Sequence, residues 1–302
     1  MSVNIAGISL KNPVMNASGA FSARDSGRFY DICRLGAVVT KGVSMDPWEG
    51  NKTPRITESY GGMLNAIGLQ NPGVEKYIEE ELPFLKQFGV PVIANVAGKS
   101  IAEYCGVVER LNETEVSMLE INISCPNIKE GGISFGTDVK MAAEVTREIR
   151  KIARKPLIIK LTPNVTNIVE IAKAVESEGA DCVSLINTLL AMRIDVRKKR
   201  PVLANIMGGL SGPAIKPVAV RMVYQVKRAV NLPIIGMGGI MTGEDAAEFL
   251  MAGADAVSVG TAALINPAAP VDILAELNEF MEEQGFKNIK ELKDSFDERQ
   301  EM

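Results

Sequence analysis

Short apolar runs alternate with longer amphipathic stretches along almost the whole chain. The runs are rich in Val, Ile and Leu and stay apolar at consecutive positions, which is typical of a parallel sheet covered on both faces. They lie at 14–16 and begin again near residues 37, 90, 118, 156, 181, 232 and 255. The amphipathic stretches between and after them predict helices at 74–88, 100–112, 138–153, 166–178, 214–230, 243–252 and 270–284.

This succession predicts the α/β class and, within it, a closed (β/α)₈ TIM barrel, which also needs about 250 residues. A doubly wound open sheet is the alternative. No shift in composition marks a second domain, so residues 1–302 are expected to form one domain, with a polar tail over about 291–302. The segments 42–73 and 189–213 are too long for simple connections and are expected to be extended loops over the C-terminal mouth of the barrel.

The composition excludes several classes of function. A net charge of −4 gives no reason to expect nucleic acid or an anionic membrane as a partner. No apolar stretch approaches the ~18 residues of a membrane span, and no signal-peptide pattern is present. The four cysteines are scattered and there is no histidine, so zinc and iron–sulfur spacings are absent. We expect a reduced, cytoplasmic protein without a metal site, and without the Ser-His or Cys-His pairs of many nucleophilic enzymes.

Every predicted strand ends in an amide, a hydroxyl, an ammonium or a glycine. In a (β/α)₈ barrel these ends face the catalytic mouth. One such residue is an ordinary turn signal, but convergence from all strands predicts a ligand site. The residues are Asn16, Ser18, Lys41, Gly42, Asn95, Asn122, Cys125, Lys160, Asn187, Thr188, Gly238, Gly239, Gly260 and Thr261.

The last two strand ends predict a phosphate site. "GMGGI" precedes a predicted helix, and "SVGTAAL" follows the next strand. Glycine lets the backbone approach a ligand closely, and the free N–H groups can donate to phosphate oxygens. The loops after strands seven and eight are also the usual phosphate site of such barrels.

Amides and lysines at the other ends point to a ring-shaped ligand. An amide offers one acceptor and two donors, which complements the edge of a flavin or a pyrimidine. Lys160 ends the apolar run "LIIK", where an ammonium buried in a packed core would be costly. A place in the ligand site is the favoured interpretation, and an ion pair with a barrel glutamate is the alternative.

One cysteine differs from the others in its surroundings. Cys125 lies in "NISCPN", where a strand breaks at Pro126 among polar side chains, whereas Cys33, Cys105 and Cys182 lie within helix or strand patterns. A thiol has a reference pKa of about 8.5, which suits proton abstraction near neutral pH. In a histidine-free mouth, Cys125 is the best-placed proton acceptor.

These motifs, taken together and in order, resemble the dihydroorotate dehydrogenases. The most specific ones are "TKGVS", "GMLNAIGLQNPG", "ANVAG", "NISCPN", "KLTPNVT", "INTLLAMR", "GGLSGPAIKPVA" and "IIGMGGI". With a cysteine in "NISCPN", the chain resembles class 1 of this family. The segment "SCPNIKEGGISFG" resembles subclass 1B more closely than subclass 1A. The resemblance implies oxidation of (S)-dihydroorotate to orotate in UMP biosynthesis, with FMN as cofactor and hydride transfer to flavin N5.

The resemblance also assigns residues. Cys125 would be the catalytic base, and Lys41 would serve the flavin and the substrate together. Flavin contacts would come from Ser18, Lys41, Gly42, Asn95, Asn122, Lys160, Ile186 and Gly212, with the phosphate at Gly238, Gly239, Gly260 and Thr261. Substrate contacts would come from Lys41, Asn65, Ala66, Ile67, Gly68, Leu69, Asn122, Asn127, Asn187 and Thr188.

The chain has neither iron–sulfur cysteines nor a second nucleotide-binding unit for passing electrons to NAD. The resemblance to subclass 1B implies a partner subunit that carries FAD and a [2Fe-2S] cluster. This subunit and a homodimer of the present chain would form a heterotetramer. Three alternatives stay open. They are a fumarate-linked class 1A enzyme, a related flavin barrel acting on other dihydropyrimidines, and a phosphate-binding barrel without redox chemistry.

Overall fold

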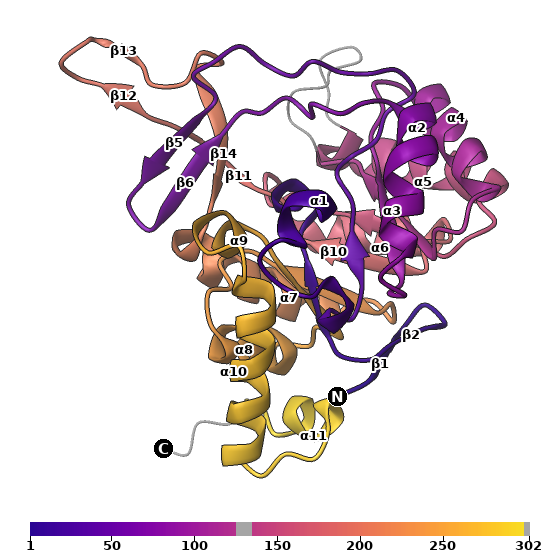
Figure 1. Cartoon of the computed structure of the whole chain (residues 1–302), viewed down its shortest axis with the longest axis vertical. Coiled ribbons are helices and arrows are strands. Elements are labelled where there is room, and N and C mark those ends of the chain that lie inside the picture. Colours follow the sequence, from indigo (N-terminus) through magenta and orange to yellow (C-terminus); the bar gives the residue numbers. More distant parts are fainter. Residues whose placement is uncertain (125–134, 299–302) are drawn as a thin grey trace.

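Eight parallel strands form the centre of the molecule and helices surround them (Figure 1). The computed structural model describes residues 1–124 and 135–298. Within this part the strand order is β3-β16-β15-β10-β9-β8-β7-β4, and a parallel bridge between Met15 and Ala37 joins the two ends of that order. The prediction of a closed (β/α)₈ barrel is confirmed, and the alternative of a doubly wound open sheet is wrong. The strands are β3 (Val14–Asn16), β4 (Val38–Val39), β7 (Val92–Val96), β8 (Met118–Asn122), β9 (Leu157–Lys160), β10 (Cys182–Leu185), β15 (Ile234–Met237) and β16 (Ala256–Val259).

The outer helices follow the predicted amphipathic stretches. Several begin at a side chain that accepts a backbone N–H of the first turn, as Ser100, Asp138, Asn167 and Thr242 do. These caps explain why the helices start where they do. The helices are α2 (Val74–Lys76), a π-helical turn (Tyr77–Glu81), α3 (Leu82–Lys86), α4 (Ile101–Asn112), α5 (Val139–Ile152), α6 (Ile168–Ser177), α7 (Lys216–Lys227), α8 (Gly243–Met251) and α10 (Ala269–Glu283).

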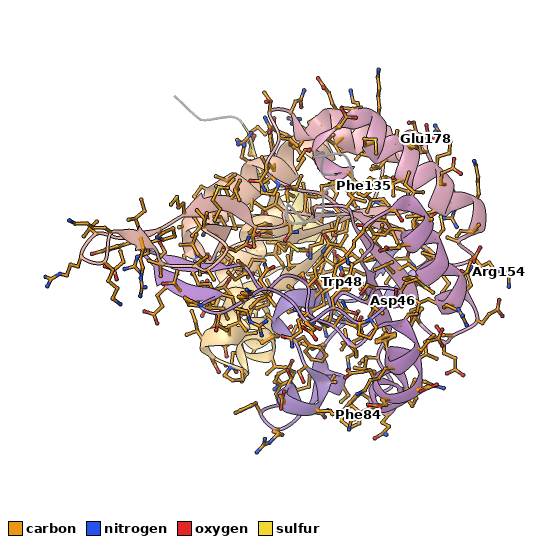
Figure 2. The ribbon with its side chains drawn as sticks, turned by 90° about the horizontal axis from the view of Figure 1, so that it is seen from above. Asp46, Trp48, Phe84, Phe135, Arg154 and Glu178 are labelled. Carbon is orange, nitrogen blue, oxygen red and sulfur yellow. The ribbon has the colours of Figure 1, made fainter. Side chains whose placement is uncertain are left out.

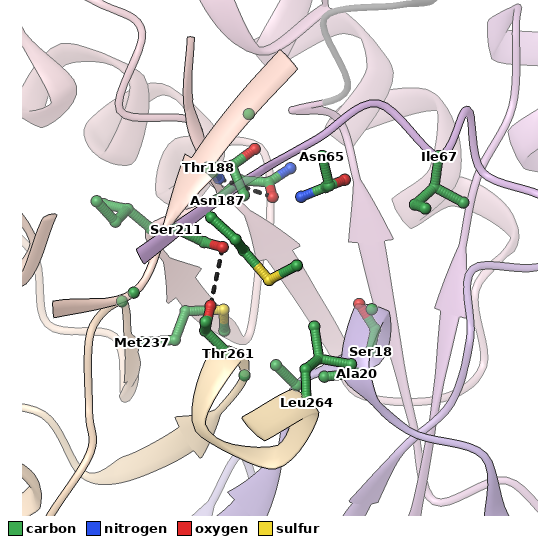
Figure 3. Close-up of a pocket in the computed structure, with 18 of the residues that line it drawn as sticks. Ser18, Ala20, Asn65, Ile67, Asn187, Thr188, Ser211, Met237, Thr261 and Leu264 are labelled. Carbon is green, nitrogen blue, oxygen red and sulfur yellow. Dashed lines mark hydrogen bonds between the residues drawn. The ribbon is translucent and has the colours of Figure 1, made fainter. Parts of the chain in front are cut away.

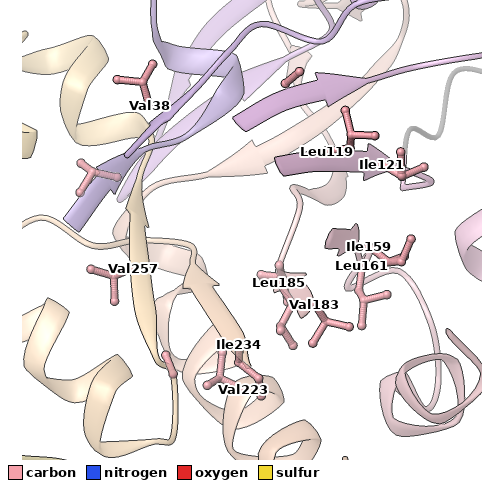
Figure 4. Close-up of a cluster of buried hydrophobic side chains, with 14 of the residues drawn as sticks. Val38, Leu119, Ile121, Ile159, Leu161, Val183, Leu185, Val223, Ile234 and Val257 are labelled. Atoms are coloured by element: carbon pink, nitrogen blue, oxygen red, sulfur yellow. The ribbon is translucent and has the colours of Figure 1, made fainter. Parts of the chain in front are cut away.

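Two apolar layers hold the barrel together. Side chains such as Leu119 and Ile121 of β8 face outward and pack under the helices (Figure 4). Met118 of the same strand belongs to a second cluster, inside the barrel. Ile5 and Leu10, from the hairpin of β1 (Val3–Ile5) and β2 (Ile8–Leu10), are buried in that inner cluster. The hairpin therefore closes the amino-terminal end of the barrel.

The two segments predicted as long loops pair with each other. They form a four-stranded antiparallel sheet in the order β11-β14-β6-β5, extended by the hairpin of β12 (Ile194–Asp195) and β13 (Arg200–Pro201). The sheet projects to one side of the barrel, away from the helical side that carries Arg154 and Glu178 (Figure 2). Its strands are β5 (Ile56–Ser59), β6 (Gly62–Asn65), β11 (Leu189–Met192) and β14 (Met207–Ser211).

Three further α-helices are short: α1 (Ala23–Ser26), α9 (Thr261–Ile265) and α11 (Ile289–Asp294). Ile289 and Leu292 of α11 are buried, and the helix packs on α8. The segment predicted as a polar tail from about residue 291 is therefore helical up to Asp294, because its apolar positions reach the barrel. No helix of the described ranges is both long and apolar enough to cross a membrane.

Candidate active site

A cavity opens at the carboxyl ends of the barrel strands (Figure 3). Its wall includes residues from strand ends that lie far apart in the sequence. Most of the described residues predicted for the site line it, both those assigned to a cofactor and those assigned to a substrate. They are Ser18, Lys41, Asn65, Ala66, Ile67, Gly68, Leu69, Asn122, Lys160, Ile186, Asn187, Thr188, Gly212, Gly238, Gly239, Gly260 and Thr261.

Five predicted residues do not line the cavity or lie outside the described part of the chain. Asn16, Gly42 and Asn95 are not among the residues that line the cavity. Both polar ends of the Asn16 amide are bonded to the backbone of Val39 instead. Asn95 is fully buried, and its amide oxygen finds no hydrogen-bond partner among the described residues. That oxygen lies 2.8 Å from where a Cβ on Gly42 would be, so only glycine leaves the space beside it free. Cys125 and Asn127 lie outside the described residues, and their roles stay predictions.

The structure adds lining residues that sequence reasoning missed. Ile56, Met63, Gly209 and Ser211 come from the antiparallel sheet, and Leu264 comes from α9. Thr261 Oγ1 donates to Ser211 Oγ over 2.8 Å, which ties β14 to the end of the last barrel strand (Figure 3). The motif "GGLSGPAIKPVA" contained Ser211, but only the pairing of β14 with β6 places it over the mouth.

Three glycines with left-handed backbone form one wall, here called the glycine cradle: Gly212, Gly238 and Gly239. Their φ angles are +102°, +126° and +86°, a region that favours glycine. A Cβ on Gly239 would lie 2.7 Å from the Cβ of Lys216 and 2.9 Å from the carbonyl oxygen of Gly212. Any other residue at Gly239 would be strained and would overlap its neighbours, so this wall of the cavity requires glycine.

A chain of hydrogen bonds orients two amide side chains that line the cavity, those of Asn122 and Asn187. Ser124 Oγ donates to Asn122 Oδ1 over 2.7 Å, and Asn187 Nδ2 donates to Ser124 Oγ over 2.7 Å. The backbone N–H of Thr188 donates to Asn187 Oδ1 over 2.9 Å. Tyr104 Oη donates to the carbonyl oxygen of Asn122 over 2.8 Å. Asn122 and Asn187 are thus held in fixed orientations before any ligand arrives.

Both interpretations of Lys160, a place in the ligand site and an ion pair with a barrel glutamate, agree with the structure. It lines the cavity, and its ammonium lies 3.5 Å from Ser18 Oγ and 3.5 Å from Glu120 Oε1. Both side chains of the ion pair are almost completely buried. Glu120 was missed by sequence reasoning, although its position two residues before Asn122 on a strand places both side chains on one face.

The remaining cysteines lie away from the cavity. Cys33 is in a short 3₁₀ turn, Cys105 is in α4 and Cys182 is inside the barrel on β10. Burial raises the pKa of the Cys182 thiol well above its usual value, which keeps it protonated. Across the described ranges, no group of three or more Cys, Asp or Glu side chains could hold a metal ion.

Fold and site together define a (β/α)₈ barrel protein whose mouth joins a glycine cradle to a pocket of amides and lysines. A family model described as dihydroorotate dehydrogenase matches residues 1–281. The chain belongs to this family.

Relatives of nearly the same length support the assignment. A protein of Alkaliphilus metalliredigens (strain QYMF) is 60% identical over 98% of each chain, and one of Alkaliphilus oremlandii (strain OhILAs) is 57% identical over 97% of each. A protein of Geobacillus sp. (strain WCH70) is 54% identical over 96% of this chain and 94% of its own. All three are named dihydroorotate dehydrogenase B (NAD(+)), catalytic subunit.

Proposed function

We propose that this chain oxidises (S)-dihydroorotate to orotate in UMP biosynthesis, with FMN as its cofactor, and that its electrons pass to NAD through a partner subunit. The observation that carries the proposal is that a glycine cradle, oriented amides and a buried lysine line the same cavity. The names of the relatives agree with this substrate and this acceptor.

The residues present fit FMN. The glycine cradle offers backbone N–H groups to a phosphate, with Gly260 and Thr261 beside it, in space that side chains would fill. The unpartnered oxygen of Asn95 is a buried acceptor, which costs about 1 to 3 kcal/mol unless a donor reaches it. A flavin ring carries such an N–H donor. Ser18, Lys41, Gly42, Asn122, Lys160, Ile186 and Gly212 would complete the ring site.

When bound, FMN supplies the hydride acceptor for C6 of dihydroorotate. Lys160 provides positive charge beside the ring, and such a preplaced charge is worth most in a buried site. Asn122, Asn187 and Thr188 present donors and acceptors that match the amide edge and the carboxylate of the substrate. Lys41 and the run Asn65, Ala66, Ile67, Gly68 and Leu69 would complete the substrate site.

Cys125 would take the proton from C5 of the substrate. Its predecessor Ser124 forms hydrogen bonds with Asn122 and Asn187, two side chains of the cavity wall, and is fixed beside that wall. At pH 7 only a few per cent of an ordinary thiol is thiolate. Turnover should therefore rise with pH as Cys125 ionises.

A partner subunit would carry FAD and a [2Fe-2S] cluster, and two copies of this chain with two such subunits would form a heterotetramer. Large apolar side chains on the projecting hairpin and on α9 support burial against another chain. Val196 is 79% exposed and Ile265 is 68% exposed. Exposed apolar patches commonly mark protein interfaces.

The test is a visible spectrum of the purified chain before and after anaerobic addition of dihydroorotate. A yellow protein that bleaches supports the cofactor, the substrate and the half-reaction together. A colourless protein would favour a barrel without redox chemistry, and bleaching by dihydrouracil but not by dihydroorotate would favour another dihydropyrimidine. Turnover with fumarate, without need of NAD and a partner, would identify a class 1A enzyme.

A further inference from the structure

A layer of polar side chains crosses the inside of the barrel just below the cavity. It consists of Asn95 on β7, Glu120 on β8, Lys160 on β9 and Ser184 on β10, four neighbouring strands of the sheet. The exposed fraction of each residue is 4% or less. Below it lies the apolar inner cluster with Met118 and Ile158.

Glu120 is the hub of this layer. Its Oε1 accepts from Asn95 Nδ2 over 2.5 Å and lies 3.5 Å from Lys160 Nζ, while its Oε2 accepts from Ser184 Oγ over 2.7 Å. A carboxylate buried without partners would be very costly. Here both carboxylate oxygens of Glu120 accept hydrogen bonds, and the positive charge of Lys160 neutralises the carboxylate.

The same carboxylate decides which way the Asn95 amide faces. An ionised carboxylate only accepts hydrogen bonds, so Asn95 must turn its NH₂ group toward Glu120. Its oxygen then faces the space beside Gly42, where it has no partner among the described residues. Glu120 does not line the cavity itself. Through its contacts it orients one hydrogen-bond acceptor, the amide oxygen of Asn95, and one cation, the ammonium of Lys160.

We propose that Glu120 is the positioning residue of the cofactor site: it orients the Asn95 amide and the Lys160 ammonium, and its buried negative charge lowers the reduction potential of the flavin. This inference rests on the proposed function, because it requires a flavin in the cavity. Lys160 favours the anionic reduced ring. Glu120 offsets part of that effect, because its charge is opposite and only 3.5 Å from the ammonium.

The proposal predicts opposite shifts for the two partners of the ion pair. In Glu120→Gln the flavin should become easier to reduce, by about tenfold or more in the equilibrium constant, where tenfold is about 30 mV for two electrons. In Lys160→Gln it should become harder to reduce. Glu120→Gln should also weaken FMN binding by at least severalfold, because a glutamine amide no longer forces the Asn95 oxygen toward the ligand.

The measurements are the potential of the bound flavin, from equilibration with reference dyes, and the FMN dissociation constant of the apoprotein. Glu113→Gln is the matched control. It removes the same charge from a side chain that is 71% exposed and pairs with Arg154 at the surface, and it should change neither quantity. A potential in Glu120→Gln equal to that of Glu113→Gln would overturn the proposal.

A double variant keeps the test decisive if Glu120→Gln does not fold. Glu120→Gln with Lys160→Gln removes the two charges together, and its potential should lie clearly above that of Lys160→Gln alone. Equal potentials in these two variants would show that Glu120 has no electrostatic effect. If the parent chain binds no FMN, or its flavin is not bleached by dihydroorotate, the proposed function fails instead.

Discussion

Replacing Gly239 by alanine tests whether the glycine cradle holds a phosphate. Gly239 has φ +86°, and an L residue in this region costs about 1 to 2 kcal/mol. The new Cβ would also lie 2.7 Å from the Cβ of Lys216, well inside the 3.5–4.0 Å optimum, and such overpacking costs about 1 to 3 kcal/mol. The free energy of unfolding should therefore fall by about 2 to 5 kcal/mol.

The backbone has to move to relieve this overlap, and the N–H groups that we propose bind the phosphate move with it. Losing one hydrogen bond to a charged phosphate costs about 1.5 to 3 kcal/mol, which corresponds to about a 10- to 150-fold increase in the FMN dissociation constant. Titration of the apoprotein with FMN, followed by quenching of flavin fluorescence, measures this constant. Urea unfolding measures the stability.

Gly285→Ala is the control for backbone strain. Gly285 has φ +76° and lies in an exposed turn, where a Cβ would meet nothing within 4 Å. This variant should lose about 1 to 2 kcal/mol of stability and keep the affinity of the parent for FMN. Folded Gly239→Ala with unchanged FMN affinity would refute the reasoning, as would an equal loss of affinity in both variants.

Two further predictions concern proton transfer and acid stability. Cys125→Ser should keep the flavin but lose most turnover at pH 7, with a smaller loss at higher pH; equal turnover of variant and parent at pH 7 would contradict the role of Cys125 as base. Burial raises the pKa of Asp245, but hydrogen bonds from Lys216 and from the backbone of Met241 and Thr242 outweigh it and hold the pKa below 3.8. The carboxylate therefore stabilises the fold fully above its unfolded pKa and loses this effect as pH falls through the folded pKa. Asp245→Asn should be less stable than the parent by about 1 to 3 kcal/mol in urea at pH 7. The difference should shrink below about pH 3.8, and an equal difference at pH 7 and pH 3 would contradict the assignment.

Local sequence was sufficient to predict the barrel. A parallel strand buried on both faces must be apolar at every position, and an outer helix must be apolar on one side only, so both leave a pattern within a few residues. The strand ends were equally visible, because Asn122, Lys160 and Gly238 interrupt apolar runs. The antiparallel sheet over the mouth was not predicted, since β6 and β14 acquire their partners only when distant segments meet.

The order of residues along the chain is enough to specify the eight-stranded barrel, the polar rim at its carboxyl end and the positions that require glycine. Each of these follows from burial or backbone freedom at single positions. Three contacts exist only in the folded chain: Thr261 bonds to Ser211, the NH₂ group of Asn95 bonds to Glu120, and Lys160 pairs with Glu120. Those contacts join residues from different strands, and the electrostatic energy of a buried charge depends on which groups lie within a few ångströms of it.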